Sequence, residues 1–280
     1  MLTEVKAYSS WRSAPTLLLD PEGRNESDLI QLTNVAGLDP VKASVNTSLY
    51  GSIDGSSYVG SSVDKRNIVL TLKPNPDWRT WTYEKLRRLL YAYFMPKLVT
   101  QLVFYSDDMP PVQIAGVVED VSVNMFSKTP ELNVSIICPD PYFTSLDPIV
   151  LTGQASGSPM PTVIDYQGTE ETGIRLKVTY IAASPTKIGI QIGDPKITYF
   201  EVEATVDAAK YFELSSLPMQ KFVQQVNIGS GVIENLLPKI TIQEGTLWPV
   251  LEPGENEFLV ITDSGVQDWE LTYYERFGGL

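Results

Sequence analysis

The run 138–143, Cys-Pro-Asp-Pro-Tyr-Phe, constrains the fold of this chain more than any other stretch. It follows an alternation of apolar residues over 121–137, which is typical of β-strand structure. Pro139 and Pro141 end that alternation, because proline has no amide hydrogen to donate to a neighbouring strand. The aromatic pair 142–143 indicates that the chain then packs against something. The run therefore marks the end of a sheet.

The first half of the chain is predicted to contain strands and a single helix. Short apolar runs predict strands at 16–19, 29–32, 41–45, 67–72, 98–105, 112–124 and 132–137. A helix is predicted at about 80–95, where residues with helical spacing form an apolar stripe of Trp78, Leu86, Leu89, Leu90 and Tyr93. Pro96 ends this helix, because the residue before a proline avoids helical backbone angles. Residues 1–148 are thus predicted to form an α+β domain.

The segment 46–64 is rich in glycine and serine and allows two interpretations. Such a composition is typical of a disordered linker. Tyr50 and Tyr58, together with the turn-forming step at Asp54 and Gly55, favour instead a hairpin arm that becomes ordered on a partner. The residues leave both interpretations open.

The second half is predicted to be a sandwich of short strands. Turn residues separate predicted strands at 174–180, 187–192, 199–204, 211–214, 239–242, 257–261 and 266–274. Glycine, serine and proline gather in 151–163, and the domain boundary is expected just before or within this stretch. The second domain is predicted at 149–280.

Composition argues against most catalytic chemistry. The chain has one cysteine and no histidine, which excludes a Ser-His-Asp triad and histidine-containing metal sites. Cys138 lies at the end of a predicted strand, so we expect an inert, packed thiol. We recognise no nucleotide, zinc or calcium motif, and predict no enzyme activity and no cofactor. We also expect synthesis in a cytoplasm, because no leader or bilayer-spanning run is apparent.

Charge is distributed unevenly along the chain. The formal net charge is −13, which disfavours stable binding to nucleic acid or to anionic membranes. Residues 65–97 nevertheless carry eight Lys or Arg against two acidic residues. This basic segment, which includes Arg87 and Arg88, could meet an acidic face of a second copy. A solvated helix face with intrahelical ion pairs is the alternative.

The order of several motifs resembles one family over nearly the whole chain. A glycine-rich arm with Gly51, Asp54 and Gly55 leads into Arg66-Asn67-Ile68, a single helix ends at Pro96, and Gly116-Val-Val precedes the strand that closes at Asp140-Pro-Tyr-Phe143. The turn at 251–256 and a terminal strand at 269–276 follow in the second half. This arrangement resembles the distal tail proteins of bacteriophages with long, non-contractile tails.

The resemblance implies a structural virion protein of the phage tail, made in the bacterial host's cytoplasm. It implies a homo-hexameric ring built by the first domain, a hairpin arm at about 49–64 that reaches a neighbouring subunit, and a second domain with a jelly-roll or galectin-like sandwich. The implied partners are the tail-tube, tail-tip hub and tape-measure proteins, and receptor-binding components. Candidate subunit contacts are Tyr50, Asp54, Gly55, Tyr58, Arg66, Arg87 and Arg88. The implied exit from the ring domain is formed by Asp140, Pro141, Tyr142 and Phe143.

Two other functions are alternatives to the ring. A carbohydrate-binding module would contact glycans through the second domain, where Trp248 and Trp269 could stack on sugar rings or instead belong to the core. A glycosidase would need a carboxylate pair, for which the many acidic residues give no specific signal.

Overall fold

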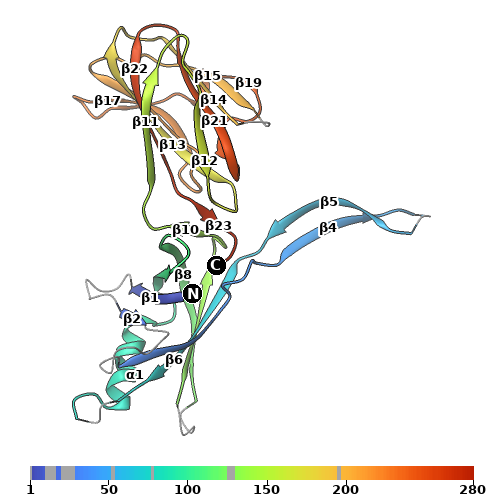
Figure 1. The fold of residues 1–280 in the computed structure, drawn as a ribbon, viewed down its shortest axis with the longest axis vertical. Helices are drawn as coiled ribbons and strands as arrows, with labels where there is room; N and C mark the ends of the chain where they lie inside the picture. The colour runs from blue at the N-terminus through green and yellow to red at the C-terminus, as the bar shows by residue number, and fades with distance from the viewer. Residues whose placement is uncertain are drawn as a thin grey trace. The chain divides into compact units, whose positions relative to one another are not determined.

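The computed structural model describes residues 2–9, 17–19, 29–51, 54–76, 79–124, 130–193 and 197–280 (Figure 1). Trp78 of the predicted helix stripe and Thr16 of the first predicted strand lie outside the described residues. The chain divides into two compact units. The first comprises Met1–Leu146 together with Phe277–Leu280, and the second comprises Asp147–Arg276.

The first unit is built on one antiparallel sheet with the strand order β2-β1-β7-β8-β9-β6-β3. These strands are β1 (Leu2–Ser9), β2 (Leu17–Leu19), β3 (Ile30–Ala36), β6 (Arg66–Pro74), β7 (Val99–Ser106), β8 (Val112–Val123) and β9 (Leu132–Cys138). A short strand, β10 (Phe143–Ser145), pairs with the start of β8. Arg66–Leu72 of β6 pair with Leu132–Cys138 of β9, so strands from before and after the predicted helix lie side by side in one sheet.

One helix, α1 (Tyr83–Tyr93), packs on the apolar core of this sheet. It buries Leu86, Leu90 and Tyr93, which confirms the predicted stripe among the described residues, and Leu89 is half-buried against the same core. The helix is shorter than predicted and ends before Phe94, whose amide still donates to the Leu90 carbonyl.

The second unit is a sandwich of two sheets, as predicted. One has the order β11-β22-β13-β16-β17-β18 and the other β12-β21-β14-β15-β19. The strands are β11 (Ile149–Ala155), β12 (Thr162–Tyr166), β13 (Thr172–Ala182), β14 (Lys187–Ile192), β15 (Thr198–Glu203), β16 (Lys210–Ser215), β17 (Phe222–Asn227), β18 (Ile233–Asn235), β19 (Ile240–Glu244), β21 (Gly254–Thr262) and β22 (Val266–Tyr273). A two-residue strand, β20 (Val250–Leu251), pairs with β13, and the 3-10 turn η1 spans Leu237–Lys239.

Several strands were not predicted from the sequence, and β11 shows why. Its glycine-containing part lies within the predicted domain boundary, but β11 pairs with β22 along its whole length. Gly153 lies opposite Trp269, and a β-carbon at Gly153 would overlap the indole ring. The glycine therefore makes room for a buried tryptophan within the sandwich. Strands β1, β12, β17 and β18 were missed as well.

The last residues of the chain belong to the first unit rather than to the second. Strand β23 (Arg276–Phe277) pairs with β10, and Phe277 is buried in the core of the first unit. The predicted second domain, 149–280, therefore differs from the observed unit at its C-terminal end. The sandwich is an insertion between Leu146 and Phe277 of the first unit.

Replacing Gly153 by alanine tests the close packing against Trp269. We expect Gly153→Ala to destabilise the sandwich by about 1–3 kcal/mol, because the added methyl group must displace the indole. Gly157→Ala is the matched control, since the nearest atom to its β-carbon is the Thr262 carbonyl oxygen at 3.6 Å. Denaturant unfolding of the full chain measures both, and equal stability of the two variants would contradict the packing account.

Candidate functional site

The arm is a two-stranded hairpin formed by β4 (Ala43–Leu49) and β5 (Ser56–Val63). Within the described residues these two strands pair only with each other, and Figure 1 shows them projecting from the rest of the first unit. The structure thus favours the hairpin over the disordered linker. It also corrects the boundaries, because the predicted strand 41–45 is largely the first part of this arm.

The register of the hairpin separates its side chains into two different faces. Val45 pairs with Ser61, Thr47 with Tyr58, Leu49 with Ser56 and Ala43 with Val63, so these residues share one face. The paired residues of the other face are small or polar, namely Ser44, Asn46, Ser48, Ser57, Gly60 and Ser62. A register shift between Asn46 and Thr47 leaves Val59, which is exposed, without a partner in this pairing. We call the first of these two faces the apolar face of the arm.

The apolar face is exposed to solvent in the single chain. Relative exposures are 58% for Val45, 83% for Leu49 and 66% for Tyr58. A two-stranded hairpin without further packing is marginally stable in water, and clustered exposed apolar residues mark interaction surfaces. The arm therefore has the properties of a segment that is covered by another molecule.

The root of the arm is held by the buried side chain of Arg66, which is 2% exposed. Its guanidinium donates to the carbonyl oxygens of Gly37 at 2.6 Å, Asp39 at 2.8 Å, Pro141 at 2.6 Å and Gly278 at 2.5 Å. We call Arg66 and these four carbonyl groups the Arg66 cluster. It joins the segment before the arm, the predicted domain exit and the returning C-terminal residues.

The Arg66 cluster is a buried charge bound by backbone dipoles. Burial lowers the pKa of Arg66 below its ordinary value, although the nearby Cys138 and Asp39 act in the opposite direction. The guanidinium carbon also lies 4.5 Å from the centre of the Phe143 ring. A planar group with several fixed donors can serve four acceptors at once, which the single ammonium of lysine matches poorly.

Backbone geometry around the cluster requires glycine. Gly37 has a φ of +91°, and a β-carbon there would overlap the carbonyl oxygen of Asn67. A β-carbon at Gly279 would lie 2.8 Å from Cδ of Pro40. The Leu280 amide donates to the Leu38 carbonyl at 3.0 Å. The Gly-Gly pair at 278–279 is the sequence signal for this close approach.

The predicted site residues fall into different environments. Tyr50, Asp54 and Gly55 are exposed at the turn of the arm, where Gly55 has a φ of +111°, and Tyr58 lies on the apolar face. Arg66 is buried at the base of the arm, where its charge is used inside the chain, and a role of Arg66 near a subunit contact stays a prediction.

The helix arginines lie on α1 rather than on the arm. Arg88 is exposed, whereas Arg87 is half-buried with its guanidinium carbon 6.0 Å from the centre of the Tyr91 ring. With Arg66 buried, the exposed basic residues of the segment are Lys65, Arg79, Lys85, Arg88 and Lys97. Contacts of these residues with another subunit remain predictions.

The domain-exit motif is fixed within the first unit. The Tyr142 amide donates to the Asp140 carboxylate at 3.2 Å, which forms a tight turn after β9. The carbonyl group of Pro141 belongs to the Arg66 cluster. The ring of buried Phe143 packs edge to face against that of Phe104, with 5.7 Å between the ring centres. The motif therefore attaches the chain to the core before the first unit ends at Leu146.

The side chains considered above for catalysis or ligand binding, namely the cysteine and two tryptophans, are packed in or against the cores. Cys138 is buried, and burial raises the pKa of its thiol to about 11. The part of the chain that the structure describes contains no group of three metal-binding side chains and no helix long and apolar enough to cross a membrane. Trp269 is buried in the sandwich core and Trp248 is half-buried against it. Neither tryptophan offers a fully exposed ring for stacking on a sugar.

Replacing Arg66 by methionine should destabilise the first unit. The change leaves four carbonyl groups without their charged donor, and we expect a loss of about 3 kcal/mol or more. Arg88→Met is the matched control on the exposed side of α1 and should change stability by about 0.5 kcal/mol or less. Denaturant unfolding of each variant tests this, and similar stabilities would refute the structural role of Arg66.

The thiol of Cys138 should be unreactive in the folded protein. A pKa of about 11 keeps it protonated at pH 8, and burial blocks access. Iodoacetamide should therefore label Cys138 only after unfolding in guanidinium, as measured by mass spectrometry. Rapid labelling of the native protein would show that the strand end is open.

Comparisons with known proteins agree with this architecture. Residues 23–138 match the phage tail protein RIFT-related domain. No curated protein sequence matches the chain. The solved structure of SPP1 Dit (gp 19.1) superposes on this chain with a TM-score of 0.67 at 15% sequence identity. The superposition covers 98% of this chain and 99% of that one. SPP1 Dit is described as a paradigm of the hub adsorption apparatus in phages that infect Gram-positive bacteria. The phage P2 baseplate, in its activated conformation with calcium, gives a TM-score of 0.45 at 12% identity, with full coverage of both chains.

At this low identity the SPP1 Dit superposition shows a common fold, whereas the domain match relates residues 23–138 of the first unit to phage tail proteins. The resemblance drawn from the sequence is confirmed. The chain carries a phage tail protein RIFT-related domain and is a structural protein of the virion tail.

Proposed function

We propose that this tail protein forms a hexameric ring at the tail tip, in which each arm binds the neighbouring copy. The ring joins the tail tube to the tail-tip hub. The observation that carries the proposal is the apolar face of the arm, which is uncovered in the single chain although it contains Val45, Leu49 and Tyr58. Burial of such side chains is the main driving force of protein association.

The ring also requires two different surfaces on one chain. A contact between unlike surfaces closes into a ring when each copy is related to the next by a fixed rotation. The arm supplies one such surface, and the remainder of the first unit supplies the other. The exposed basic residues of 65–97 can add electrostatic steering, because the chain as a whole is acidic.

The sandwich is proposed to serve as the attachment platform of the ring. Because it is inserted between Leu146 and Phe277, both of its connections begin and end in the first unit. Two connections restrict the orientation of an inserted domain more than one flexible linker would. This suits a platform that docks receptor-binding components. The proposed role requires no catalytic step.

The mass of the assembled protein tests the ring. Light scattering of the purified full chain should give six times the mass of the 31.1 kDa subunit, or, after mixing with the tail-tube and hub proteins, the mass of a complex that contains six copies of it. A strict monomer under both conditions would overturn the proposal.

Substitutions on the two faces of the arm separate assembly from folding. The double variant Val45→Ser, Leu49→Ser removes two exposed apolar side chains, and we expect it to weaken assembly by more than about tenfold. The control Ser44→Ala, Ser48→Ala lies on the opposite face of the same strand. Both variants should unfold within about 0.5 kcal/mol of the parent chain, because all four sites are exposed. Equal assembly of the two variants would show that the apolar face is not the contact.

A further inference from the structure

The loop of the arm holds a sequence step that can react with itself. Asp54 is the one aspartate of the chain that is followed by glycine, and no asparagine is followed by glycine. In such a step the amide nitrogen of Gly55 can attack the side-chain carboxyl carbon of Asp54. A new nitrogen–carbon bond closes a cyclic succinimide, and the carboxyl group loses one oxygen as water.

Hydrolysis of the succinimide can change the path of the main chain. Water returns and breaks the bond between the ring nitrogen and the main-chain carbonyl carbon of Asp54. The product is isoaspartate, in which the main chain runs through the former side-chain carboxyl group and the original main-chain carbonyl group becomes a free carboxylate. The reaction needs no oxidant, reductant or co-reactant other than water.

Both reacting groups are available in the arm. Strand pairing ends at Leu49 and Ser56, so Asp54 and Gly55 lie outside the hydrogen-bonded ladder, and both are exposed. Among the residues that the structure describes, no hydrogen-bond or ion-pair partner is found for the Asp54 carboxylate or the Gly55 amide. The amide is therefore free to turn toward the carboxyl group.

The surroundings of Gly55 leave room for this movement. Its φ of +111° belongs to a region that glycine reaches without strain. Apart from the chain neighbours, no atom lies within 4 Å of the position that a β-carbon would occupy there. Exposed loop tips are also the places where proteins tolerate a changed main chain best.

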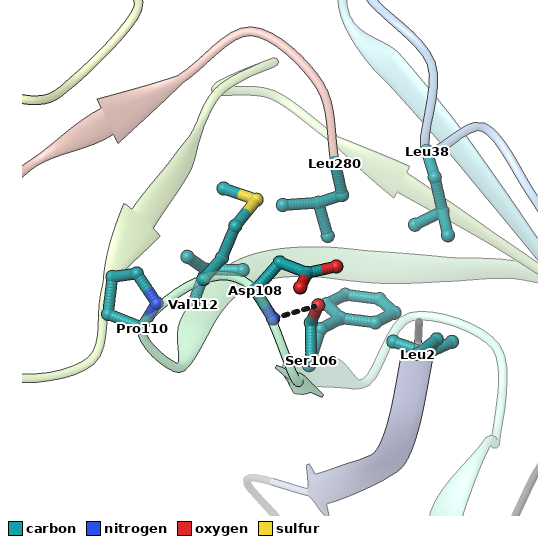
Figure 2. A pocket seen from close by; sticks show the side chains of 9 residues that line it. Leu2, Leu38, Ser106, Asp108, Pro110, Val112 and Leu280 are labelled. Atoms are coloured by element: carbon teal, nitrogen blue, oxygen red, sulfur yellow. Dashed lines mark hydrogen bonds between the residues drawn. The ribbon is translucent and has the colours of Figure 1, made fainter.

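The turn after β7 shows how other aspartates are protected. Figure 2 shows this turn beside a pocket of about 320 Å³. The amide that could attack Asp107 is that of Asp108, and it donates to the Ser106 hydroxyl at 3.4 Å. Asp108 is followed by Met109, whose long side chain hinders the same attack.

Asp263 in the second unit gives a closer comparison, because a small residue, Ser264, follows it. The Asp263 carboxylate accepts from the Thr186 amide at 2.9 Å, from the Thr186 hydroxyl and from the Lys187 amide at 3.2 Å. A carboxylate bound in this way must lose these hydrogen bonds before it can meet the following amide. Asp263 should therefore stay unmodified in the folded chain.

We propose that Asp54-Gly55 is a site of spontaneous isoaspartate formation in the folded, unassembled chain. The reaction adds one carbon to the main chain of the loop and places a carboxylate where the peptide carbonyl group was. A changed loop on the arm should lower the fraction of aged subunits that assemble. This consequence rests on the proposed ring, whereas the modification itself does not.

Ageing of the purified full chain tests the site. Samples are kept at neutral pH, either folded or unfolded in urea, and isoaspartate is quantified with an isoaspartyl methyltransferase and located by electron-transfer fragmentation. We expect isoaspartate to accumulate at residue 54 in the folded chain nearly as fast as in the unfolded chain, and at residue 263 only after unfolding. The matched variant Asp54→Glu should lose the signal, because attack on its longer side chain requires a larger ring.

Two results would overturn the proposal. Isoaspartate that forms at residue 54 only in urea would mean that the folded loop keeps the two groups apart. Equal accumulation at residues 54 and 263 of the folded chain would mean that the free groups of the arm do not select the site.

Light scattering of fresh and aged chains separates the consequence from the ring. A hexamer that is lost on ageing of the parent chain, but retained on ageing of Asp54→Glu, supports the effect of the modification on assembly. Equal assembly of fresh and aged parent chains overturns that effect and leaves the ring intact. A fresh chain that stays monomeric with its partners overturns the ring, while the isoaspartate measurement still decides the modification.

Discussion

The binding of one buried guanidinium by four backbone carbonyl groups determines how the parts of the first unit meet. Arg66 connects segments that are distant in sequence: the loop before the arm, the turn after β9 and the returning C-terminal residues. Each hydrogen bond to a charged group contributes about 1.5–3 kcal/mol in comparable cases, and an unpaired buried charge is strongly unfavourable. The cluster therefore favours one arrangement of these segments, and the base of the arm is specified by the same interaction that closes the unit.

The arm illustrates how composition can hide a pattern. Glycine and serine gave the segment 46–64 the appearance of a linker, whereas the register of β4 and β5 places Val45, Leu49 and Tyr58 on one face. Because the paired residues of the opposite face are small or polar, the hairpin is amphipathic without any charged side chain within its strands. Such a surface suits a contact between copies of one chain. It can bury apolar area in the assembled protein, and its polar side chains keep the arm hydrated in the isolated subunit.

Sequence periodicity was sufficient to predict the helices and strands that depend only on residues close together in the chain. The helix stripe, the end of β9 at the two prolines and the alternation of β22 were all visible, since each depends on residues close in the chain. The register of the arm, the Arg66 cluster and the return of Phe277 to the first core depend on contacts between distant residues, and propensities carry no information on these. Strand β11 was missed for a related reason, because Gly153 is explained only by Trp269 on the paired strand.

Hydrogen exchange of the arm tests the central claim most directly, namely that a second copy covers its apolar face. Amides of 43–49 and 56–63 should exchange quickly in isolated subunits and markedly more slowly in the assembled protein. Equal exchange of the arm in the two states would contradict the claim, because it would mean that the hairpin remains uncovered after assembly.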